Sequence, residues 1–394
     1  MSLVLELSLL AVPVVLVGYA YLAYPLLLGV VRNRSAHVPA PGDVGEWPLL
    51  TVTVPAYNEA GAIGGTLERI LELDYPPDRR QVLVVSDASS DGTDEIVRRY
   101  ADRGVELVRL PVRGGKTAAE NAARLHIRGE IVVNTDASVR LHRDSLKPLI
   151  AVFADPTIGV ASGRDVSVAR LGADANAGES GYVGYEMWVR DLETAAGGIV
   201  GASGCYYASR RDLHEEIVPA ALSRDFAAPL IAHEHGFRSV SVRDAVCFVP
   251  RQGSLRMEYR RKVRTMSRGL QTLFYKRHLM NPFRHGRFAW MLLSHKLARW
   301  LVPWGVVCGV IGGLLLSART PALAATATLG VVGVTACALI GWFWSETRLP
   351  RPVALIAYLA WGILAGLQAW INAARGDMTP TWEPTRREVV DESE

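Results

Sequence analysis

Four long apolar stretches limit what this chain can fold into more than any other feature. The first runs from Ser2 to Val31 with Glu6 as its one charged residue, and it exceeds the roughly 20 residues that a spanning helix needs. It lacks the charged start and small-residue cleavage site of a signal peptide, which favours a membrane anchor at 1–31. The others lie at 301–316, 321–344 and 352–371, inside a predicted transmembrane region 301–374. A hydrophobic fraction of 49% agrees with a chain partly embedded in lipid.

Basic residues beside these stretches predict how the chain is oriented. Arginines follow the first stretch and separate the third from the fourth: Arg32, Arg34, Arg348 and Arg351. By the positive-inside rule both flanks are cytoplasmic, so we expect a multi-pass protein of the cell membrane with its polar segment, 46–285, in the cytoplasm. Four spans would leave the polar tail 375–394 outside. That tail nevertheless carries Arg375, Arg386 and Arg387. Either the tail breaks the rule, or one stretch is re-entrant or interfacial.

Within the polar segment, strand-like and helix-like patterns alternate. Apolar runs fall at 50–54, 81–86, 105–110 and 130–134, and helix-like stretches separate them at 60–73, 92–102 and 115–127. This alternation predicts an α/β domain over 46–250, with an open parallel sheet and right-handed crossovers. The turns contain neither Gly-x-Gly-x-x-Gly nor a Gly-Lys-Ser/Thr phosphate loop, which argues against a nicotinamide site and against an ATPase.

Two acids, Asp87 and Asp136, each close one of the apolar runs. Open parallel sheets bind ligands at the carboxyl ends of their strands, so acids at these positions are expected in a binding site. Asp87 is suited to accept from a base or a ribose hydroxyl, although a turn-forming role in its loop is an equal alternative. Asp136 and Ser138 offer hard oxygen ligands for a Mg²⁺ or Mn²⁺ ion that holds a diphosphate. Lys116 opens a helix-like stretch, where it can reach phosphate or brace Asp87.

The first apolar run ends in a proline-stiffened turn. Pro55 is followed by Tyr57, Asn58 and Glu59, just before a helix-like stretch. This turn can present polar side chains to a ligand. Alternatively, Asn58 is simply the N-cap of the helix that follows.

In this order and spacing, the motifs resemble the inverting family 2 glycosyltransferases with a nucleotide-diphospho-sugar (GT-A, Rossmann-like) fold. The matching stretches include Val-Pro-Ala-Tyr-Asn-Glu, Ser-Asp-Ala-Ser-Ser-Asp-Gly-Thr, Arg-Gly-Gly-Lys-Thr-Ala-Ala-Glu-Asn-Ala, Thr-Asp-Ala-Ser and Ser-Arg-Asp-Phe. The resemblance implies that Asp87 holds uridine, that Asp136 meets a metal-bound diphosphate and that Asp225 is the catalytic base. The set implied to bind the nucleotide sugar is Pro55, Tyr57, Glu59, Asp87, Lys116 and Asp136.

Three positions depart from the family pattern. Ser86 and Ser138 stand where relatives often carry a second acid, and Arg224 stands where many place Glu before the base. A lower affinity for metal follows if one acid replaces two. Asp225 itself is present, and proton removal from the acceptor hydroxyl needs that one carboxylate.

A basic, amphipathic segment is expected at 251–300, between the α/β domain and the later spans. Arginines recur there every four residues, at Arg256, Arg260, Arg264 and Arg268. One interpretation places this helix on anionic lipid headgroups. In the other, Arg261 or Arg264 reaches the diphosphate. Processive relatives carry Gln-x-x-Arg-Trp at about this distance beyond the base, and this chain has Arg-Arg-Lys-Val-Arg instead.

The sequence therefore predicts a membrane-anchored inverting glycosyltransferase that uses a nucleotide-diphosphate donor, expected to be a UDP-sugar. Its acceptor is expected to be lipid-linked or a polysaccharide. A processive synthase that exports its polymer is the alternative within the enzyme class, and a non-catalytic nucleotide-sugar-binding scaffold is the alternative outside it. A net charge of +4 implies no nucleic-acid partner, and four cysteines without a Cys-x-x-Cys pair indicate neither a disulfide frame nor a zinc site. Membrane lipids are expected partners, and a homo-oligomer is left open.

Overall fold

The computed structural model describes residues 3–32, 42, 44–168, 177–250, 255–344, 349–376 and 381, with the side chains of 167, 177–182 and 250 excepted. The chain divides into two compact units. The sheet unit draws its described residues from Arg32–Leu171, Glu179–Arg251 and Met378–Glu394, and the helical unit draws them from Met1–Val31, Gly172–Gly178 and Gln252–Asp377. The predicted polar tail, with Arg386 and Arg387, lies almost entirely outside the described residues, as do Arg34 and Arg348.

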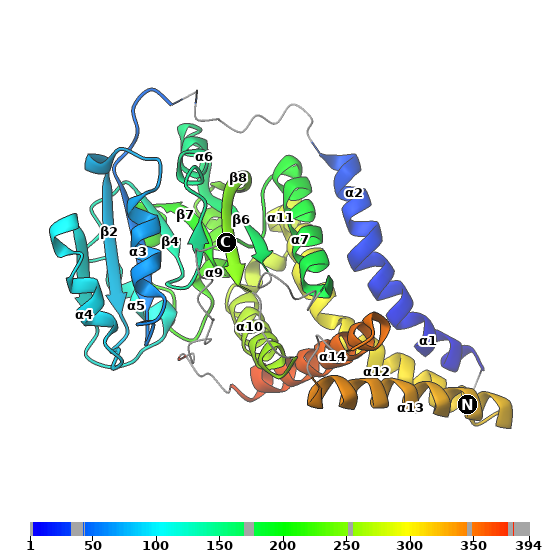
Figure 1. The fold of residues 1–394 in the computed structure, drawn as a ribbon. Coiled ribbons are helices and arrows are strands. Elements are labelled where there is room, and N and C mark those ends of the chain that lie inside the picture. The colour runs from blue at the N-terminus through cyan, green and yellow to red at the C-terminus, as the bar shows by residue number, and fades with distance from the viewer. Residues whose placement is uncertain are drawn as a thin grey trace. The chain divides into compact units, whose positions relative to one another are not determined.

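One mixed sheet organises the sheet unit (Figure 1). The strands are β1 (Leu50–Ala56), β2 (Arg80–Ser86), β3 (Val105–Arg109), β4 (Ile131–Thr135), β5 (Arg140–Leu141), β6 (Ile158–Val168), β7 (Tyr206–Arg210) and β8 (Arg238–Pro250). Their spatial order is β3-β2-β1-β4-β7-β6-β8-β5. The first four are mutually parallel, whereas β7 runs antiparallel to both β4 and β6. The predicted apolar runs therefore form the parallel half, and the less regular second half of the domain adds the antiparallel strands.

Helices cover both faces of this sheet. They are α3 (Ile63–Leu71), α4 (Thr93–Arg98), α5 (Lys116–Ala123), α6 (Leu146–Ala151), α7 (Ala177–Ala196), α8 (Arg211–His214) and α9 (Arg224–Glu234). Alternate residues of β2 face opposite sides, so Val82 and Val84 join one buried cluster while Leu83 and Val85 join another. Burial on both faces explains why the sequence shows continuous apolar runs instead of alternation.

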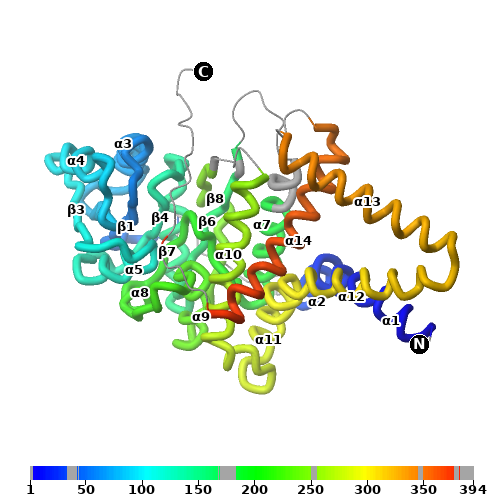
Figure 2. The backbone as a smooth tube through the Cα atoms, turned by 90° about the horizontal axis from the view of Figure 1, so that it is seen from below, coloured from blue at the N-terminus to red at the C-terminus, as the bar shows by residue number. Residues whose placement is uncertain are grey.

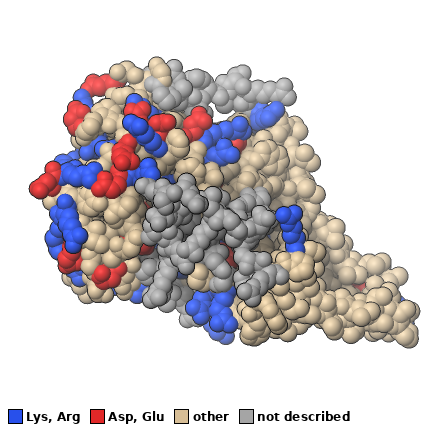
Figure 3. Space-filling model, viewed as in Figure 1, with Lys and Arg blue, Asp and Glu red and all other residues tan. Residues whose placement is uncertain are grey.

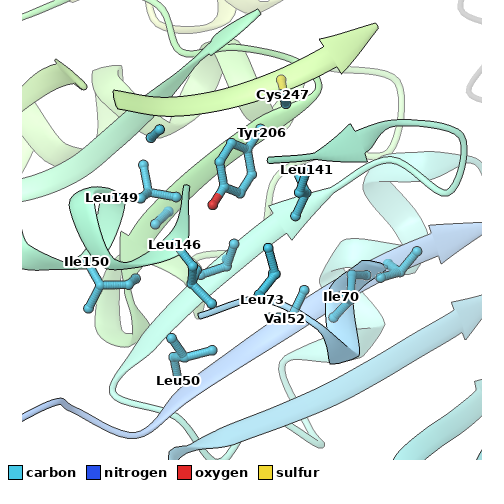
Figure 4. Packing of buried hydrophobic residues seen from close by; sticks show 14 of the residues in the cluster. Leu50, Val52, Ile70, Leu73, Leu141, Leu146, Leu149, Ile150, Tyr206 and Cys247 are labelled. Carbon is cyan, nitrogen blue, oxygen red and sulfur yellow. The ribbon is translucent and has the colours of Figure 1, made fainter. Parts of the chain in front are cut away.

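The larger cluster fills one face of the sheet around Leu50, Val52, Leu146 and Tyr206 (Figure 4). All four side chains are completely buried. At roughly 25 cal/mol per Å² of apolar area, each such side chain stabilises the fold by about 1.5–3 kcal/mol before entropy is counted. This packing fixes the strands, and through them the turns at their carboxyl ends.

The helical unit contains α1 (Leu3–Gly18), α2 (Tyr24–Val31), α10 (Leu255–Tyr275), α11 (Pro282–Leu292), α12 (Ala298–Ser317), α13 (Pro321–Phe343) and α14 (Arg351–Arg375). Among the described residues, four helical segments are long and apolar enough to cross a membrane: Leu3–Val31, Pro282–Ser317, Pro321–Phe343 and Arg351–Arg375. Charged side chains are nearly absent from the surface of α12 and α13, whereas the sheet unit is densely charged (Figure 3). The four apolar stretches of the sequence thus correspond to four apolar helices.

Candidate functional site

The turns that follow β1, β2 and β4 lie at one edge of the sheet. Ala56 of β1 pairs with Ser86 of β2, and Thr53 of β1 pairs with Asn134 of β4. Asp87 donates its backbone N–H to the carbonyl oxygen of Ala56 at 2.8 Å. The two acids singled out in the sequence therefore follow strands on either side of β1.

The turn after β1 is fastened to the loop after β2. Asn58, with a φ of 52°, donates its N–H to the Ser89 hydroxyl at 3.1 Å and accepts from the N–H of Ser90 at 2.8 Å through its side chain. Glu59 donates its N–H to the Thr93 hydroxyl at 2.9 Å. The interpretation of Asn58 as a helix N-cap is wrong, because α3 begins at Ile63 with Ala62 as its N-cap. Asn58 is instead a cross-link between two loops.

Asp87 is completely buried, and its carboxylate holds a glycine turn. Oδ1 accepts the N–H of Gly114 at 2.6 Å, and Oδ2 accepts the N–H of Gly115 at 2.8 Å. Hydrogen bonds to a charged acceptor contribute about 1.5–3 kcal/mol each. Gly115 has a φ of 92°, which favours glycine, and a Cβ on Gly114 would lie 2.8 Å from that of Ala118. Asp87 therefore shapes the turn that delivers Arg113 and Lys116.

Arg113 lies over the ring of Tyr57, with its guanidinium carbon 3.8 Å from the ring centroid. A stacked cation–aromatic pair of this kind is worth about 0.5–2 kcal/mol. It joins the β1 turn to the glycine turn. The sequence assigned no role to Arg113, although the residue lies in one of the recognised motifs.

Lys116, the first residue of α5, reaches across to the end of β4. Its Nζ donates to Oδ1 of Asp136 at 2.5 Å and to the carbonyl oxygen of Gly204 at 2.6 Å. Of the two predicted roles, bracing Asp87 is therefore wrong, because the acid that Lys116 braces is Asp136. Burial by itself lowers the pKa of Lys116, but Asp136, Glu120 and Asp225 raise that pKa above its usual value, so the ammonium keeps its charge.

Asp225 lies in the first turn of α9, where a helix favours negative charge. Ser223 donates its hydroxyl to Oδ1 of Asp225 at 2.6 Å. On the other side lies Gly204, where an added Cβ would be only 3.0 Å from Oδ2 of Asp225. Because Lys116 bonds the carbonyl of the same glycine, Gly204 brings Asp225 and Asp136 into one site.

Comparison with known proteins gives the family of this domain. Residues 51–218 match the model of the family described as Glycosyl transferase family 2. Residues 51–218 are a family 2 glycosyltransferase domain. The mannosyltransferase PcManGT from Pyrobaculum calidifontis, solved in complex with GDP-Man and Mn²⁺, is 26% identical with a TM-score of 0.70, and the match covers 93% of this chain and 99% of that one. The predicted GT-A fold and the assignment as an enzyme are confirmed.

Two relatives with named activities match parts of the chain. The beta-monoglucosyldiacylglycerol synthase of Synechocystis sp. is 33% identical over 117 residues, 29% of this chain. The chain spans only 24% of that relative's length. An N-acetylglucosaminyltransferase of Rhizobium meliloti is 25% identical over 329 residues, which cover 77% of this chain and 74% of the relative.

Arg224 is held by the elements around the start of α9. It is buried, and its guanidinium donates to the carbonyl oxygens of His214 at 3.1 Å and Glu216 at 2.8 Å, and to Oδ1 of Asn121 at 2.7 Å. These bonds tie the start of α9 to α5 and α8. The departure from Glu at this position therefore supplies an anchor beside Asp225.

Glu120 is a buried acid of the glycosyltransferase site that sequence reasoning missed. It lies one helical turn after Lys116 on α5, a spacing that places the two side chains on one face. Burial raises the pKa of Glu120 to about 7, although Lys116 and Arg224 pull that pKa down. The four-residue spacing within the Lys-Thr-Ala-Ala-Glu motif was the available signal.

The donor set at the end of β4 fits a hard divalent cation that arrives with a diphosphate. Asp136 has a side chain 26% exposed, and Ser138 follows it in the same partly exposed turn. Within the described ranges no group of three His, Cys, Asp or Glu side chains could hold a metal. One carboxylate and one hydroxyl leave most of the six coordination positions of Mg²⁺ or Mn²⁺ to phosphate oxygens and water. The predicted metal role of Asp136 and Ser138 stays a prediction.

The remaining predicted residues fall in two places. Pro55 lies in β1, and Glu59 accepts the N–H groups of Ala62 and Ile63 at 2.9 and 2.8 Å through its carbonyl oxygen. Arg261 and Arg264 belong to α10 in the helical unit, and Arg261 pairs there with Glu258 at 2.8 Å. Contact of these two arginines with the diphosphate stays a prediction.

Proposed function

We propose that the protein transfers a sugar with inversion from a nucleotide-diphosphate donor, a UDP-sugar, to a lipid-linked or polysaccharide acceptor at the cytoplasmic face of the membrane. The observation that carries the proposal is the convergence of Asp225, Asp136 and Lys116 around Gly204. A base, an acid suited to a metal-bound phosphate and a fixed cation are the groups that such a transfer requires.

Asp225 acts as the base in this mechanism. The acceptor hydroxyl loses its proton to the carboxylate as its oxygen attacks the anomeric carbon and the bond to the nucleoside diphosphate breaks. A positioned base accelerates such a step by about 10²–10⁴-fold. The Ser223 hydroxyl bond at 2.6 Å holds the carboxylate in one orientation.

The donor half of the site handles the charge of the diphosphate. Lys116 holds a fixed ammonium beside Asp136, and such a preorganised cation stabilises charge that develops on the leaving phosphate. The stacked pair of Tyr57 and Arg113 offers a flat surface for the nucleoside. A divalent cation, held by Asp136 and Ser138, would neutralise the diphosphate further.

Two lines of support favour a lipid-borne acceptor. The described part of the chain carries four helices apolar enough to span a membrane, which a water-soluble acceptor does not require. The Synechocystis relative is named as a glucosyldiacylglycerol synthase, whose product is a glycolipid. The GDP-Man bound by PcManGT makes a GDP-sugar the donor to test beside UDP-sugars.

The test is nucleotide release by the full-length protein in lipid, with Mn²⁺ and a panel of UDP- and GDP-sugars. We expect one donor to be consumed, with Asp225→Asn lowering turnover by about 10²-fold or more. Asp144→Asn, an exposed carboxylate of the same domain, is the matched control and should leave turnover unchanged. Absence of release from every donor, or an Asp225→Asn variant with full activity, would refute the proposal. Product length distinguishes single additions from a processive synthase.

A further inference from the structure

The helical unit contains one apolar helix whose neighbours conflict with a membrane crossing. By length and hydropathy α14, with 25 residues, qualifies as a fourth span. If it crossed, its two ends would lie on opposite sides of a hydrocarbon layer about 30 Å thick. Its contacts within the helical unit allow that depth difference to be checked.

The crossing direction is fixed by α1 and α12, which pack antiparallel. Added Cβ atoms on Gly309 and Gly312 would lie 2.7 Å from Pro13 and 2.8 Å from Leu9. At one end of this pair Arg319 donates to both carboxylate oxygens of Glu6, at 2.6 and 2.9 Å. We call this the Glu6 end.

The opposite end of the pair lies where the α2 and α11 segments meet. Trp290 donates its indole N–H to the Tyr19 hydroxyl at 3.2 Å, and its ring lies 5.3 Å from that of Tyr24. Trp300 and Pro303 are in the first turns of α12, so they too belong to this half of the pair. We call this the Trp290 end.

Helix α13 starts next to Arg319 and returns across the layer. Its last turns meet α10 and the first half of α14: an added Cβ on Gly341 would lie 3.0 Å from Leu255 and 2.5 Å from Ala357. Trp342 stacks on Trp361 with ring centroids 4.0 Å apart. Up to α14 the chain therefore crosses the layer three times, at Leu3–Val31, Pro282–Ser317 and Pro321–Phe343.

Helix α14 then runs alongside α10 instead of crossing back (Figure 2). Near its start, Tyr358 lies under the Lys262 ammonium, 3.5 Å from the ring centroid. Near its end, Trp370 contacts Phe274, with ring centroids 5.9 Å apart. The contacts advance in step along both helices, so α14 follows α10 in the same direction over most of its length.

The C-terminal end of α14 lies at the Trp290 end, which is not where a fourth crossing would place it. Trp370 donates its indole N–H to the carbonyl oxygen of Trp300 at 2.8 Å, and an added Cβ on Gly366 would lie 2.4 Å from Pro303. Both partners belong to the Trp290 end. A crossing helix would bring Trp370 to the Glu6 end, beside Arg319.

The charge on α10 supports the same conclusion. This helix carries six basic residues, which the hydrocarbon core disfavours at about 2.5–3.5 kcal/mol each at its centre. They are Arg256, Arg260, Arg261, Lys262, Arg264 and Arg268. A helix that accompanies α10 shares its depth. Helix α14 also exposes Leu355, Ile356 and Leu359, which suits acyl chains.

We propose that α14 is an interfacial helix, paired with α10 among the lipid headgroups and turned with its exposed apolar residues toward the acyl chains. The chain then crosses the membrane three times, and the segment after Arg375 is on the same side as the sheet unit. Arg351 and Arg375, at the two ends of α14, then lie on the same side of the membrane, as the positive-inside rule predicts. The conflict between four crossings and the arginines of the tail disappears. This inference does not depend on the reaction that the sheet unit performs.

Single cysteines test it in the full chain after the four native cysteines have been replaced by alanine. Asp144→Cys marks the sheet unit, Ala318→Cys marks the α12–α13 connection and Ala374→Cys marks the end of α14, all at exposed positions. In sealed vesicles a membrane-impermeant maleimide should modify positions 144 and 374 from the same side, and position 318 from the other. Modification of 374 together with 318 would overturn the proposal.

A second measurement does not require the cysteine-free protein to fold. Reporter domains fused to the C-terminus of the natural sequence, one active only in the cytoplasm and one only outside it, give the side of the tail directly. A tail on the side of the sheet unit supports three crossings, and a tail on the opposite side supports four. Spin labels at 355, 359 and 364 should report nearly equal depths for an interfacial helix, and depths that change steadily along a span.

Discussion

The Nζ atom of Lys116 lies 2.5 Å from Oδ1 of Asp136, and this ion pair joins the first turn of α5 to the end of β4. The side chains are 22% and 26% exposed, so water screens the pair only in part. The second bond of Lys116, to the Gly204 carbonyl, extends the link to the segment that leads into β7. The cation is thereby fixed before any substrate binds.

Removing that cation should reduce turnover strongly and lower stability. Lys116→Gln removes the ammonium that binds Asp136 and the Gly204 carbonyl, so we expect a loss of about 10²-fold in kcat/KM and roughly 1–3 kcal/mol in the free energy of unfolding. Arg128→Gln, which breaks an exposed pair with Glu106, should change either quantity little. Steady-state kinetics and denaturant titration measure both. Full activity in Lys116→Gln would show that the cation serves only the fold.

Gly204 should be sensitive to a single methyl group. In Gly204→Ala the new Cβ would lie 3.0 Å from Oδ2 of Asp225, so the carboxylate must shift. We expect kcat to fall about 10-fold while KM for the donor and Tm hardly change, because a small displacement of a catalytic group is costly. Gly61→Ala, with no heavy atom within 4 Å of the new Cβ, is the control. An unchanged kcat would place Asp225 outside the chemical step.

Restoring the family's Glu at position 224 should damage the protein. The buried Arg224 guanidinium serves the oxygens of His214, Glu216 and Asn121, and a carboxylate there would face the same acceptors. Arg224→Glu should lower the free energy of unfolding by about 3–5 kcal/mol, as expected when a buried charge loses its partners. Arg211→Glu, at a half-exposed site, should have a much smaller effect on thermal unfolding. Equal stability of the two variants would exclude the anchoring role.

Glu120 should give stability a pH dependence. Its pKa is about 7 in the folded protein against an ordinary 4.5, so the folded state binds more protons between these values and stability falls as pH rises from about 4.5 to 7. Above pH 7 the loss is nearly complete, on the order of 3 kcal/mol. Glu120→Gln should flatten this slope, whereas Glu95→Gln, at an exposed site, should keep it. Denaturant titrations at pH 5, 6, 7 and 8 compare them, and an unchanged slope in Glu120→Gln would contradict the assignment.

Local pattern predicted the parallel half of the sheet well. The run at 81–86 became β2 at Arg80–Ser86, and the run at 130–134 became β4 at Ile131–Thr135, because strands buried on both faces have a strong apolar signature. The same reasoning placed Asp87 and Asp136 at one edge of the sheet. That reasoning did not predict the hydrogen-bond partners of these two acids. Whether Lys116 braces Asp87 or Asp136 depends on how the glycine turn folds back, and that information is not local in sequence.

The sequence allowed one apolar stretch to be interfacial but did not indicate that it was α14, for a related reason. Hydropathy and length report whether a helix tolerates lipid, and they do not report which helix runs beside it. The basic residues of α10 lie about a hundred positions earlier in the chain, so the constraint that they impose on Tyr358 and Trp370 appears only once tertiary contacts are known.

The reversal of direction at β7 has a consequence for how this domain can diversify. Because β7 runs antiparallel to β4, its first residue, Tyr206, pairs with the last residue of β4, Thr135. The connection that enters β7, with Gly204, therefore arrives at the ligand edge from the opposite direction to the turns that carry Asp87 and Asp136. Substitutions in that connection can therefore change the surroundings of Asp225 without moving a parallel strand.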